Sequence, residues 1–304
     1  MSVTVLMPVY NGAATLRQAL DSILAQDLGG IEVLVVDDAS TDGSACLAAE
    51  YATRDPRVSA LVNEQNLGLA ATLNHGLELA RHELVARMDQ DDEALPGRLR
   101  HQLEFMTRNP GIVVAGTFVY NMGATREQDR LVRLPVTPRE IGRTLPRENC
   151  LYHPSVVLRR TPVIAAGGYR AEFRNAEDYE LWLRLSRQHD LANIPLPLLR
   201  YRLSPGGMTL AGKWEQLYYV SLAQASFREP ALSLAEAHER ALEELSHVDR
   251  SRFMEQVTTA AVRELGRLGL WRDAVSVLRA LGPEVRPRLR IALAASLVRE
   301  QLQS

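Results

Sequence analysis

Apolar and polar positions in the first hundred residues form a regular alternation of strand and helix patterns. The run "VTVLMPV" is typical of a short strand, and the next apolar residues, Leu16, Leu20 and Ile23, recur at helical spacing. The run "IEVLVV" is apolar at nearly every position, which indicates a strand buried on both faces, as in a parallel sheet. Alternation of this kind predicts a layered α/β fold with right-handed crossovers.

The second half of the chain is less regular and ends in a long helical pattern. The segment "NAEDYELWLRLSRQ" predicts a strong helix with Asn175 as its N-cap. From residue 213 onward the pattern is helical almost throughout, and residues 288–302 form an amphipathic stretch. We therefore predict an α/β domain over residues 1–212 and an α-helical region over residues 213–304. The helical region would serve packing, oligomerisation, or contact with an acceptor or a membrane.

Composition narrows the classes of function. Apolar content of 46% and charged content of 24% are ordinary for a globular protein, and a net charge of −2 gives no general basis for nucleic-acid binding. Cys46 and Cys150 lie far apart and form no metal-ligand spacing, which predicts free thiols. No signal-peptide pattern and no apolar run of about 20 residues is found, so we expect a cytoplasmic protein. Peripheral attachment at the inner face of the cell membrane stays open.

The predicted strands end on aromatic and acidic residues, at the edge where doubly wound sheets bind their ligands. These residues are, in chain order, Pro8, Tyr10 and Asn11, then Asp37 and Asp38, then Asp89, Asp91 and Asp92. An aromatic ring can stack on a base, and clustered carboxylates suit a hard divalent ion such as Mg²⁺ or Mn²⁺. The pattern therefore predicts a nucleoside diphosphate held through a metal ion.

The acidic segment "MDQDDEALP" also has a purely structural explanation. Aspartates often cap helices, and Asp91 or Asp92 would suit the helix that contains Leu99. A lone Asp-x-Asp after a strand would favour this explanation, whereas three such strand ends in succession favour the ligand site. Asp92 and Glu93 are assigned to capping and leading the helix after Pro96.

Four segments resemble the inverting glycosyltransferases of family 2, which have a GT-A fold. They are "VLMPVYNGAATLRQALDSILAQ", "VLVVDDASTDGS", "NLGLAATLNHGLELARHELVARMDQDD" and "AEDYELWLRL". The resemblance covers roughly residues 3 to 205 and keeps the order and spacing of all four. It implies a Rossmann-like, mostly parallel sheet flanked by helices, with a helical C-terminal extension. Its motifs specify the fold and the general reaction rather than a particular sugar.

The resemblance implies a nucleotide site at the strand ends. Tyr10 and Asp38 would contact the nucleobase, usually uracil, and Pro8 would line its pocket. Asn66 and Gly68 would belong to a loop that closes over the nucleotide. The remaining candidates for nucleotide binding are Asn11, Arg87, Asp89 and Gln90. For Arg87, contact with the nucleotide and a structural ion pair are equally open.

The resemblance also implies a metal site, for Mn²⁺ or Mg²⁺, at the DXD motif Asp89-Gln90-Asp91. Asp89 would face the ribose or the metal, and Asp91 would ligate the metal that bridges the diphosphate. His153 is a candidate ligand or phosphate contact, with a satisfied buried histidine as the equal alternative. Many relatives have a further His after a "YR" segment, where this chain has Leu203 and Ser204. His153, Ser204 or water would then complete the metal shell.

The pair Glu177-Asp178 lies in the first turn of a predicted helix, where the helix dipole favours ionised carboxylates. Acidic residues at this position stabilise a helix even when they have no catalytic role, which is the structural alternative for this pair. The resemblance assigns the general base to the aspartate of such a pair, hence Asp178, with Glu177 positioning the acceptor or supporting the structure. Trp182 would offer a sugar-stacking face or belong to the core, and the core is the commoner place for an aromatic residue on such a helix.

Taken together, these features predict a metal-dependent inverting glycosyltransferase that moves a sugar from a nucleotide sugar, UDP-linked by analogy, to an acceptor hydroxyl. The expected acceptor is a saccharide or a lipid-linked saccharide in bacterial surface polysaccharide or glycoconjugate assembly. Two alternatives stay open, namely a sugar nucleotidyltransferase and a non-catalytic nucleotide-sugar-binding protein. "PVYNGAATLRQ" lacks the Gly-rich basic loop of a nucleotidyltransferase, and the altered "YRLSPGG" segment keeps the non-catalytic alternative open.

Overall fold

The structure is a computed structural model that describes residues 2–203, 210–279, 289 and 292–295 of the 304-residue chain. Ser204 and most of the amphipathic stretch 288–302 lie outside these residues. The described residues form two compact units, the first of residues 1–119 and 132–201 and the second of residues 120–131 and 202–304. The boundary predicted at residue 212 therefore falls inside the second unit.

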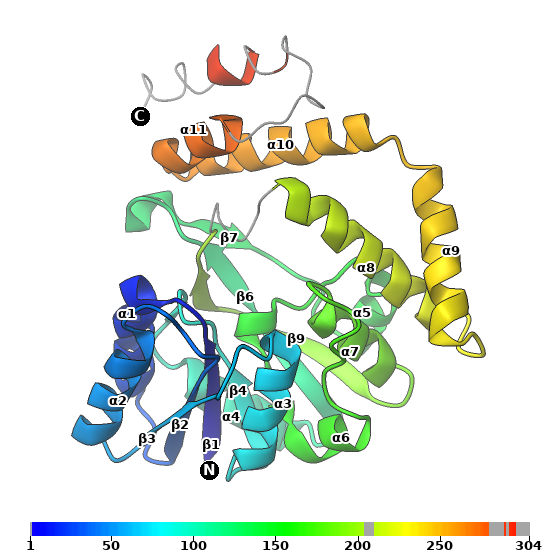
Figure 1. Ribbon diagram of the computed structural model, residues 1–304. Helices are drawn as coiled ribbons and strands as arrows, with labels where there is room; N and C mark the ends of the chain where they lie inside the picture. Colours follow the sequence, from blue (N-terminus) through cyan, green and yellow to red (C-terminus); the bar gives the residue numbers. More distant parts are fainter. Residues whose placement is uncertain (1, 204–209, 280–288, 290–291, 296–304) are drawn as a thin grey trace. The chain divides into compact units, whose positions relative to one another are not determined.

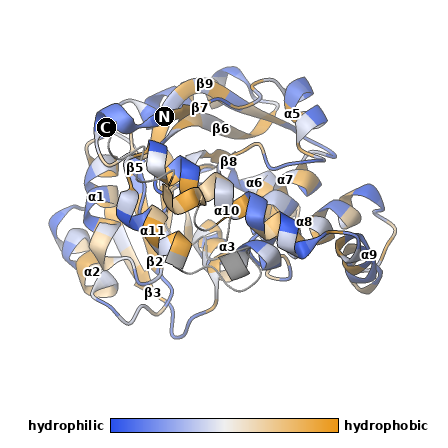
Figure 2. Cartoon of the chain, turned by 90° about the horizontal axis from the view of Figure 1, so that it is seen from above, coloured by the Kyte–Doolittle hydropathy of each residue, from blue (hydrophilic) through white to orange (hydrophobic). Residues whose placement is uncertain are grey.

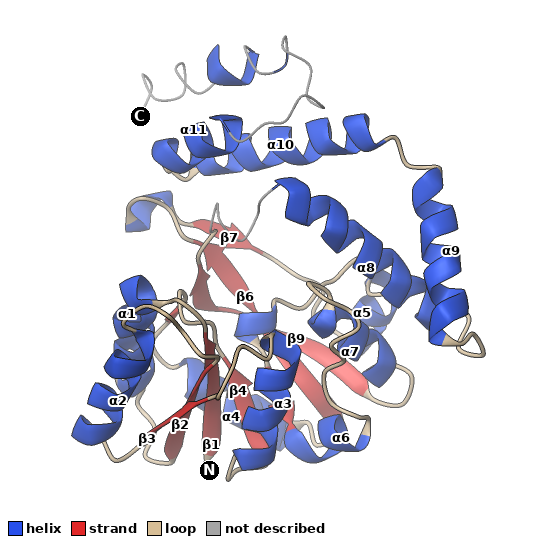
Figure 3. Cartoon of the chain, in the orientation of Figure 1, coloured by secondary structure: helices blue, strands red, loops and turns tan. Residues whose placement is uncertain are grey.

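The first unit alternates strands and helices as its sequence pattern predicts (Figure 1 and Figure 3). Its elements are β1 (Val3–Val9), α1 (Ala13–Leu24), β2 (Ile31–Asp37), α2 (Ser44–Arg54), β3 (Val58–Val62), α3 (Leu69–Leu79), β4 (Leu84–Arg87), β5 (Glu93–Ala94), α4 (Arg98–Arg108), β6 (Ile112–Asn121), α5 (Pro138–Thr144), η2 (His153–Ser155), β8 (Val157–Arg159), α6 (Arg160–Ala165), α7 (Glu177–Leu185) and β9 (Asp190–Tyr201).

One sheet runs through this unit in the order β3-β2-β1-β4-β8-β6-β9-β5. The four strands β3, β2, β1 and β4 are parallel to their neighbours, whereas β8 is antiparallel to both β4 and β6, and β5 is antiparallel to β9. Val9 lies opposite Asp37, and Leu6 lies opposite Arg87. The carboxyl ends of β1, β2 and β4 therefore meet at one edge, as the sequence predicts. A parallel half is thus joined to an antiparallel half, and helices flank the sheet, as the resemblance to a GT-A fold leads us to expect.

The side chains of β1 alternate between two buried faces. Val3, Val5 and Met7 belong to a core that α1, α2 and α4 complete. On the other face Leu6 lies against Gly76 of α3, where a Cβ would come within 2.2 Å of the leucine Cδ1, so only glycine fits. Helices on both faces explain why β1 and β2 are buried at every position. Figure 2 shows both hydrophilic (blue) and hydrophobic (orange) residues on the helices, as expected for elements that bury one face.

The second unit confirms the predicted helical character of the C-terminal region. Its helices are α8 (Leu210–Arg228), α9 (Leu234–Ser246), α10 (Arg250–Arg267) and α11 (Trp271–Arg279). Ser233 and Glu236 form a capping box at the start of α9, and Asp249 accepts a hydrogen bond from the backbone N–H of Arg252 at the start of α10. Side chains such as Val262 and Leu265 pack against α11 in a small separate core.

The second unit also contains a segment that its sequence does not mark, residues 120–131. This segment carries η1 (Arg126–Gln128) and the start of β7 (Arg130–Val132). The backbone N–H of Ala124 donates to the carbonyl of Leu268, which ties the segment to the end of α10. None of the helices in the described residues is long and apolar enough to cross a membrane.

Candidate active site

A cavity of about 690 Å³ opens at the carboxyl ends of β1, β2 and β4. Nine of the residues predicted for the site line it, namely Pro8, Tyr10, Asp38, Asn66, Gly68, Asp89, Gln90, Asp91 and Glu177. They come from five segments that are far apart in the sequence. The cavity wall does not include Asn11, Arg87, His153 or Asp178. Arg87 pairs with the lining residue Asp89, and Asp178 follows the lining residue Glu177 in the sequence.

The loop after β1 is locked to the acidic loop by one amide side chain. The backbone N–H of Tyr10 donates to Gln90 Oε1 at 2.7 Å, and Gln90 Nε2 donates to the carbonyl of Tyr10 at 3.0 Å. A Cβ at Gly12 would approach Gln90 Cδ to 2.3 Å, so glycine is needed there for this pairing. Both ends of the Gln90 amide are thus engaged with the backbone. This gives Gln90 a positioning role beside the nucleotide contact that the sequence predicts, while Tyr10 stays 49% exposed.

Asn11 adopts a left-handed backbone conformation with φ of 49° and ties the β1–α1 loop to the β2–α2 loop. Its Oδ1 accepts from the backbone N–H of Thr41 at 2.8 Å, and its own N–H donates to Ser40 Oγ at 2.9 Å. Asp42 makes a parallel link, because its Oδ2 accepts from the N–H of Ala13. Ser40, Thr41 and Asp42 therefore form a bridge between the two loops, and α2 begins after Gly43.

Asp38 is buried and fixes the loop that covers the cavity. Its Oδ1 accepts from the backbone N–H of Leu67 at 2.8 Å and its Oδ2 from that of Gly68 at 2.9 Å. Asn63 Nδ2 donates to Oδ1 as well. Burial alone would raise the pKa of Asp38, but these hydrogen bonds outweigh it and the pKa is lowered. Asp38 therefore stands ionised at neutral pH, holding the loop of Asn66 and Gly68 while also facing the cavity.

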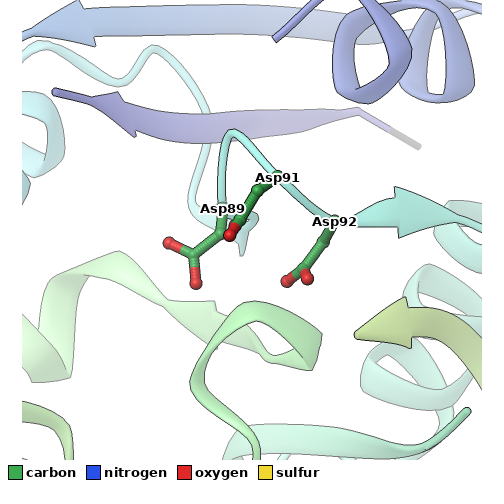
Figure 4. Close-up of side chains that lie close together, drawn as sticks. All are labelled: Asp89, Asp91 and Asp92. Atoms are coloured by element: carbon green, nitrogen blue, oxygen red, sulfur yellow. The ribbon is translucent and has the colours of Figure 1, made fainter. Parts of the chain in front are cut away.

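The carboxylates of Asp89, Asp91 and Asp92 converge at the edge of the cavity. Each offers an oxygen atom, and these atoms all lie within 4.8 Å of one another. Figure 4 shows the three side chains, on the loop between β4 and β5, pointing to the same side. Hard oxygen ligands at this spacing fit a divalent ion such as Mg²⁺ or Mn²⁺. Among the described residues no His, Cys or Glu joins this group.

Two buried arginines offset the charge of the acidic cluster. Arg87 Nη1 lies 2.5 Å from Asp89 Oδ2, and the Arg87 side chain is almost fully buried. Arg98 is completely buried, and its Nη2 donates to the carbonyls of Arg87 (2.7 Å) and Pro154 (2.8 Å). Burial lowers the pKa of Arg98 to about 10, against the opposite effect of the nearby Asp92 carboxylate. At neutral pH both guanidinium groups are therefore charged. The structural ion pair, one of the two equal alternatives for Arg87, is present, and contact with the nucleotide stays a prediction.

The acidic residues that follow the cluster do not cap the helix after Pro96. The N-cap of α4 is Gly97, with φ of 77° and no side-chain hydrogen bond, so the predicted capping role of Asp92 and Glu93 is wrong. Asp92 is buried beside the other two acids, and Glu93 forms β5, where its Oε2 accepts from Arg200 Nη1 at 2.6 Å. Glu93 and Ala94 form the two-residue strand β5, so they do not belong to the start of α4.

Glu177 and Asp178 begin α7, and both sit in surroundings that favour the protonated acid. Burial raises the pKa of each above its ordinary value, and the positive charge of Arg87 acts against the shift. Asp178 Oδ2 accepts from Asn149 Nδ2 at 2.8 Å, which orients the carboxylate. The N-cap is Ala176, not the predicted Asn175, which has a left-handed φ of 61°. A carboxylate with a raised pKa beside a cavity is suited to general base catalysis.

Comparison with known families matches the model described as "Glycosyl transferase family 2" over residues 4–166, more than half of the chain. The chain belongs to this family.

This glycosyltransferase has named relatives in bacteria. It is 36% identical over 230 residues to the amylovoran biosynthesis glycosyltransferase AmsE of Erwinia amylovora, covering 72% of this chain and 85% of the relative. It is 28% identical over 218 residues to the UDP-Glc:alpha-D-GlcNAc-diphosphoundecaprenol beta-1,3-glucosyltransferase WfgD of Escherichia coli, covering 71% and 82%. Among solved structures it resembles S. aureus TarS 1–349 in complex with UDP-GlcNAc, with a TM-score of 0.61, 18% identity and coverage of 99% and 88%. The family and GT-A fold expected from the motifs are confirmed.

His153 of the glycosyltransferase lies apart from the three converging carboxylates. Its Nε2 is 2.9 Å from the hydroxyl oxygen of Tyr169, and its ring meets Trp182 edge-on. Burial, together with the charge of Arg87, holds the pKa of His153 well below its ordinary value, so the ring is neutral. These contacts favour a structural role, and the metal-ligand role stays a prediction. Trp182 is fully buried, so it belongs to the core and does not offer a stacking face.

Three residues of the site carry no recognisable signal in the sequence. Arg98 reads as an ordinary polar position of an amphipathic helix, Asn149 lies in a loop, and Arg174 precedes a predicted cap. Their roles depend on contacts between distant segments, such as the hydrogen bond that joins Asn149 to Asp178. Only the position of Arg98, at the start of α4 and close behind the acids, gives a weak hint of a compensating charge.

Proposed function

We propose that this family 2 glycosyltransferase transfers a sugar from a nucleotide sugar, UDP-linked, to an acceptor hydroxyl with inversion at the anomeric carbon. The observation that carries the proposal is the single cavity whose wall contains Tyr10, Asp38, Asp89, Asp91 and Glu177. Tyr10 and Asp38 suit a nucleobase and ribose, whereas Asp89, Asp91 and Glu177 suit a diphosphate and the reacting sugar. Membership of a glycosyltransferase family favours sugar transfer over the nucleotidyltransferase and the non-catalytic alternative.

The acidic loop is proposed to hold Mn²⁺ or Mg²⁺ through Asp89, Asp91 and Asp92. The three carboxylates converge and fit the oxygen preference of these ions. The buried guanidinium groups of Arg87 and Arg98 would balance the negative charge of the carboxylates that the ion does not neutralise. When bound, such an ion offsets the negative charge that develops on a leaving diphosphate. Asp92 replaces His153 in this ligand set because it is Asp92 that lies with the other two acids.

Asp178 is proposed to act as the general base. The acceptor hydroxyl gives its proton to an Asp178 carboxylate oxygen as its own oxygen attacks the anomeric carbon. Asn149 holds the carboxylate in place, and burial of the pair raises its affinity for the proton. Glu177, which lines the cavity, would position the acceptor. A single displacement inverts the anomeric centre without a covalent sugar–enzyme intermediate.

The acceptor is proposed to be a saccharide, free or linked to a lipid diphosphate, in the assembly of a bacterial surface polysaccharide. The relatives support this, because the name of WfgD specifies a diphosphoundecaprenol-linked acceptor and that of AmsE specifies polysaccharide biosynthesis. The helical second unit is proposed to serve oligomerisation or contact with the acceptor or a membrane surface.

A panel of nucleotide sugars incubated with Mn²⁺ and without acceptor tests the donor half of this proposal. We expect slow release of the nucleoside diphosphate from one UDP-sugar, abolished by a chelator and in Asp91→Asn. The Arg139→Ala variant, which changes an exposed side chain of α5, serves as the control and should keep the full rate. Release of pyrophosphate from a nucleoside triphosphate plus sugar phosphate would instead identify a nucleotidyltransferase.

A further inference from the structure

The wall of the cavity contains one cationic side chain in the described part of the chain, that of Arg174. Four acidic side chains also line the wall, namely Asp38, Asp89, Asp91 and Glu177. A donor substrate adds the two negative charges of its diphosphate to this acidic surface. The cavity therefore needs positive charge next to the phosphates, and Arg174 supplies it from a segment other than the acidic loop.

Arg174 is unpaired within the part of the chain that the structure describes. It makes no hydrogen bond or ion pair with any described residue, and its side chain is exposed. The other two arginines around this segment are used by the fold. Arg170 Nη1 pairs with Glu180 Oε1 at 3.3 Å, and Arg184 Nη2 pairs with Glu180 Oε2 at 2.7 Å. Arg174 thus differs from Arg170 and Arg184, because its charge has no counter-ion among the described residues.

The local backbone places Arg174 in the same cavity wall as Glu177. It precedes α7 by three residues, and the left-handed Asn175 turns the chain between Arg174 and Glu177, so that both side chains line the same cavity. A planar guanidinium group in such a position matches the paired oxygens of a phosphate. Arg87 and Arg98 differ, because they are buried under the acidic loop and do not line the cavity.

We propose that Arg174 binds the diphosphate of the donor and stabilises it as it leaves. This inference rests on the proposed function and adds a substrate-binding residue to it. During transfer the bond from the anomeric carbon to the phosphate oxygen breaks, and its electron pair stays on that oxygen. The acceptor oxygen forms the new bond and its proton passes to Asp178. The departing diphosphate therefore gains one negative charge, which the guanidinium group of Arg174 meets from the side of α7.

Calorimetric binding of nucleoside diphosphates to the full chain in the presence of Mn²⁺ tests this role. UDP, GDP and dTDP are compared first, and the tightest is then compared with its own nucleoside. We expect Arg174→Ala to weaken binding of the diphosphate about tenfold, equivalent to about 1.4 kcal/mol, and to leave binding of the nucleoside unchanged. Arg174→Lys should recover part of the loss, and the Arg139→Ala control should bind like the wild type.

The outcomes separate this inference from the proposed function. If the wild type binds none of the diphosphates, the proposed function fails and the role of Arg174 fails with it. If the wild type binds a diphosphate and Arg174→Ala binds it equally well, only the role of Arg174 is overturned. Equal weakening for the nucleoside and its diphosphate also overturns it, because the lost contact would then not be to phosphate. If transfer kinetics of Arg174→Ala show a raised KM for the acceptor while binding of the diphosphate is unchanged, Arg174 contacts the acceptor, and the proposal is likewise overturned.

Discussion

Replacing Arg98 with methionine tests whether buried positive charge supports the acidic loop. Methionine fills a similar volume, but it leaves the carbonyls of Arg87 and Pro154 without the donors that Arg98 Nη2 provides at 2.7 and 2.8 Å. Each buried acceptor left unsatisfied costs about 1–3 kcal/mol, which gives a loss of about 2–6 kcal/mol. Removing a buried charge relieves its desolvation and offsets part of this loss. We expect a net destabilisation of about 2–4 kcal/mol.

Urea denaturation followed by the fluorescence of the buried Trp182 measures this effect in the first unit. Trp214 and Trp271 are replaced by phenylalanine in all variants so that only this unit is observed. Arg108→Met is the control, because Arg108 lies at the end of the same helix with its side chain 78% exposed. It should change the free energy of unfolding by less than about 0.5 kcal/mol. A loss in Arg98→Met no larger than that of the control would refute the structural role of Arg98.

The charge contribution of Arg98 is separated by a double-mutant cycle with Asp92→Asn, measured without metal ions. Arg98 and Asp92 interact electrostatically in the buried region below the cavity. Neutralising Asp92 should therefore be less costly, or even favourable, once Arg98 is gone. The coupling is expected to be about 0.5–3 kcal/mol. Strictly additive losses would mean that Arg98 acts through its carbonyl contacts alone.

Four further predictions concern the site. Asp178→Asn should bind nucleotide sugar normally and lose transfer by at least about a hundredfold, as seen in kcat with binding measured by calorimetry; a dead Glu177→Gln with an active Asp178→Asn would reverse the assignment. The acidic limb of the pH profile of kcat/KM should lie above the ordinary aspartate pKa, because burial raises the pKa of Asp178 and activity is lost as pH falls through it. Asn149→Ala should move this limb to higher pH, since the Asn149 hydrogen bond lowers that pKa, and an unmoved limb would contradict the contact. Gly12→Ala should displace Gln90 and raise the KM for the donor severalfold, and an unchanged KM would show that the Gln90 pairing does not position Tyr10.

The sequence predicts the first half of the fold well because each element there has a strong local pattern. Strands such as β1 and β2 are apolar on both faces, and the helices between them repeat their leucines regularly, so their order also places three strand ends at one edge. The antiparallel half is less predictable. Its strands β5 and β8 have two and three residues, too few for a periodic pattern to emerge, and their pairing is set by distant segments.

The sequence predicts the site residues that belong to a motif. It misses the residues whose role depends on a contact with a distant segment of the chain. Tyr10, Asp38, Asp89 and Asp91 are found because they follow strands. The role of Asp92 is mistaken because a capping preference is local, whereas its position beside the other acids depends on β5 pairing with β9. Arg98 is missed for the same reason. Nothing near it in the sequence shows that it reaches the carbonyl of Pro154, 56 residues away.

A crystal structure of the protein with UDP and Mn²⁺ tests the central claim most directly, because the anomalous signal of manganese locates the ion independently. The account predicts one manganese ion in contact with the carboxylate of Asp91 and with the diphosphate, the uracil ring between Tyr10 and the loop held by Asp38, and Arg174 at a phosphate oxygen. A nucleotide bound outside this cavity, or a manganese ion that makes no contact with Asp89, Asp91 or Asp92, would contradict it.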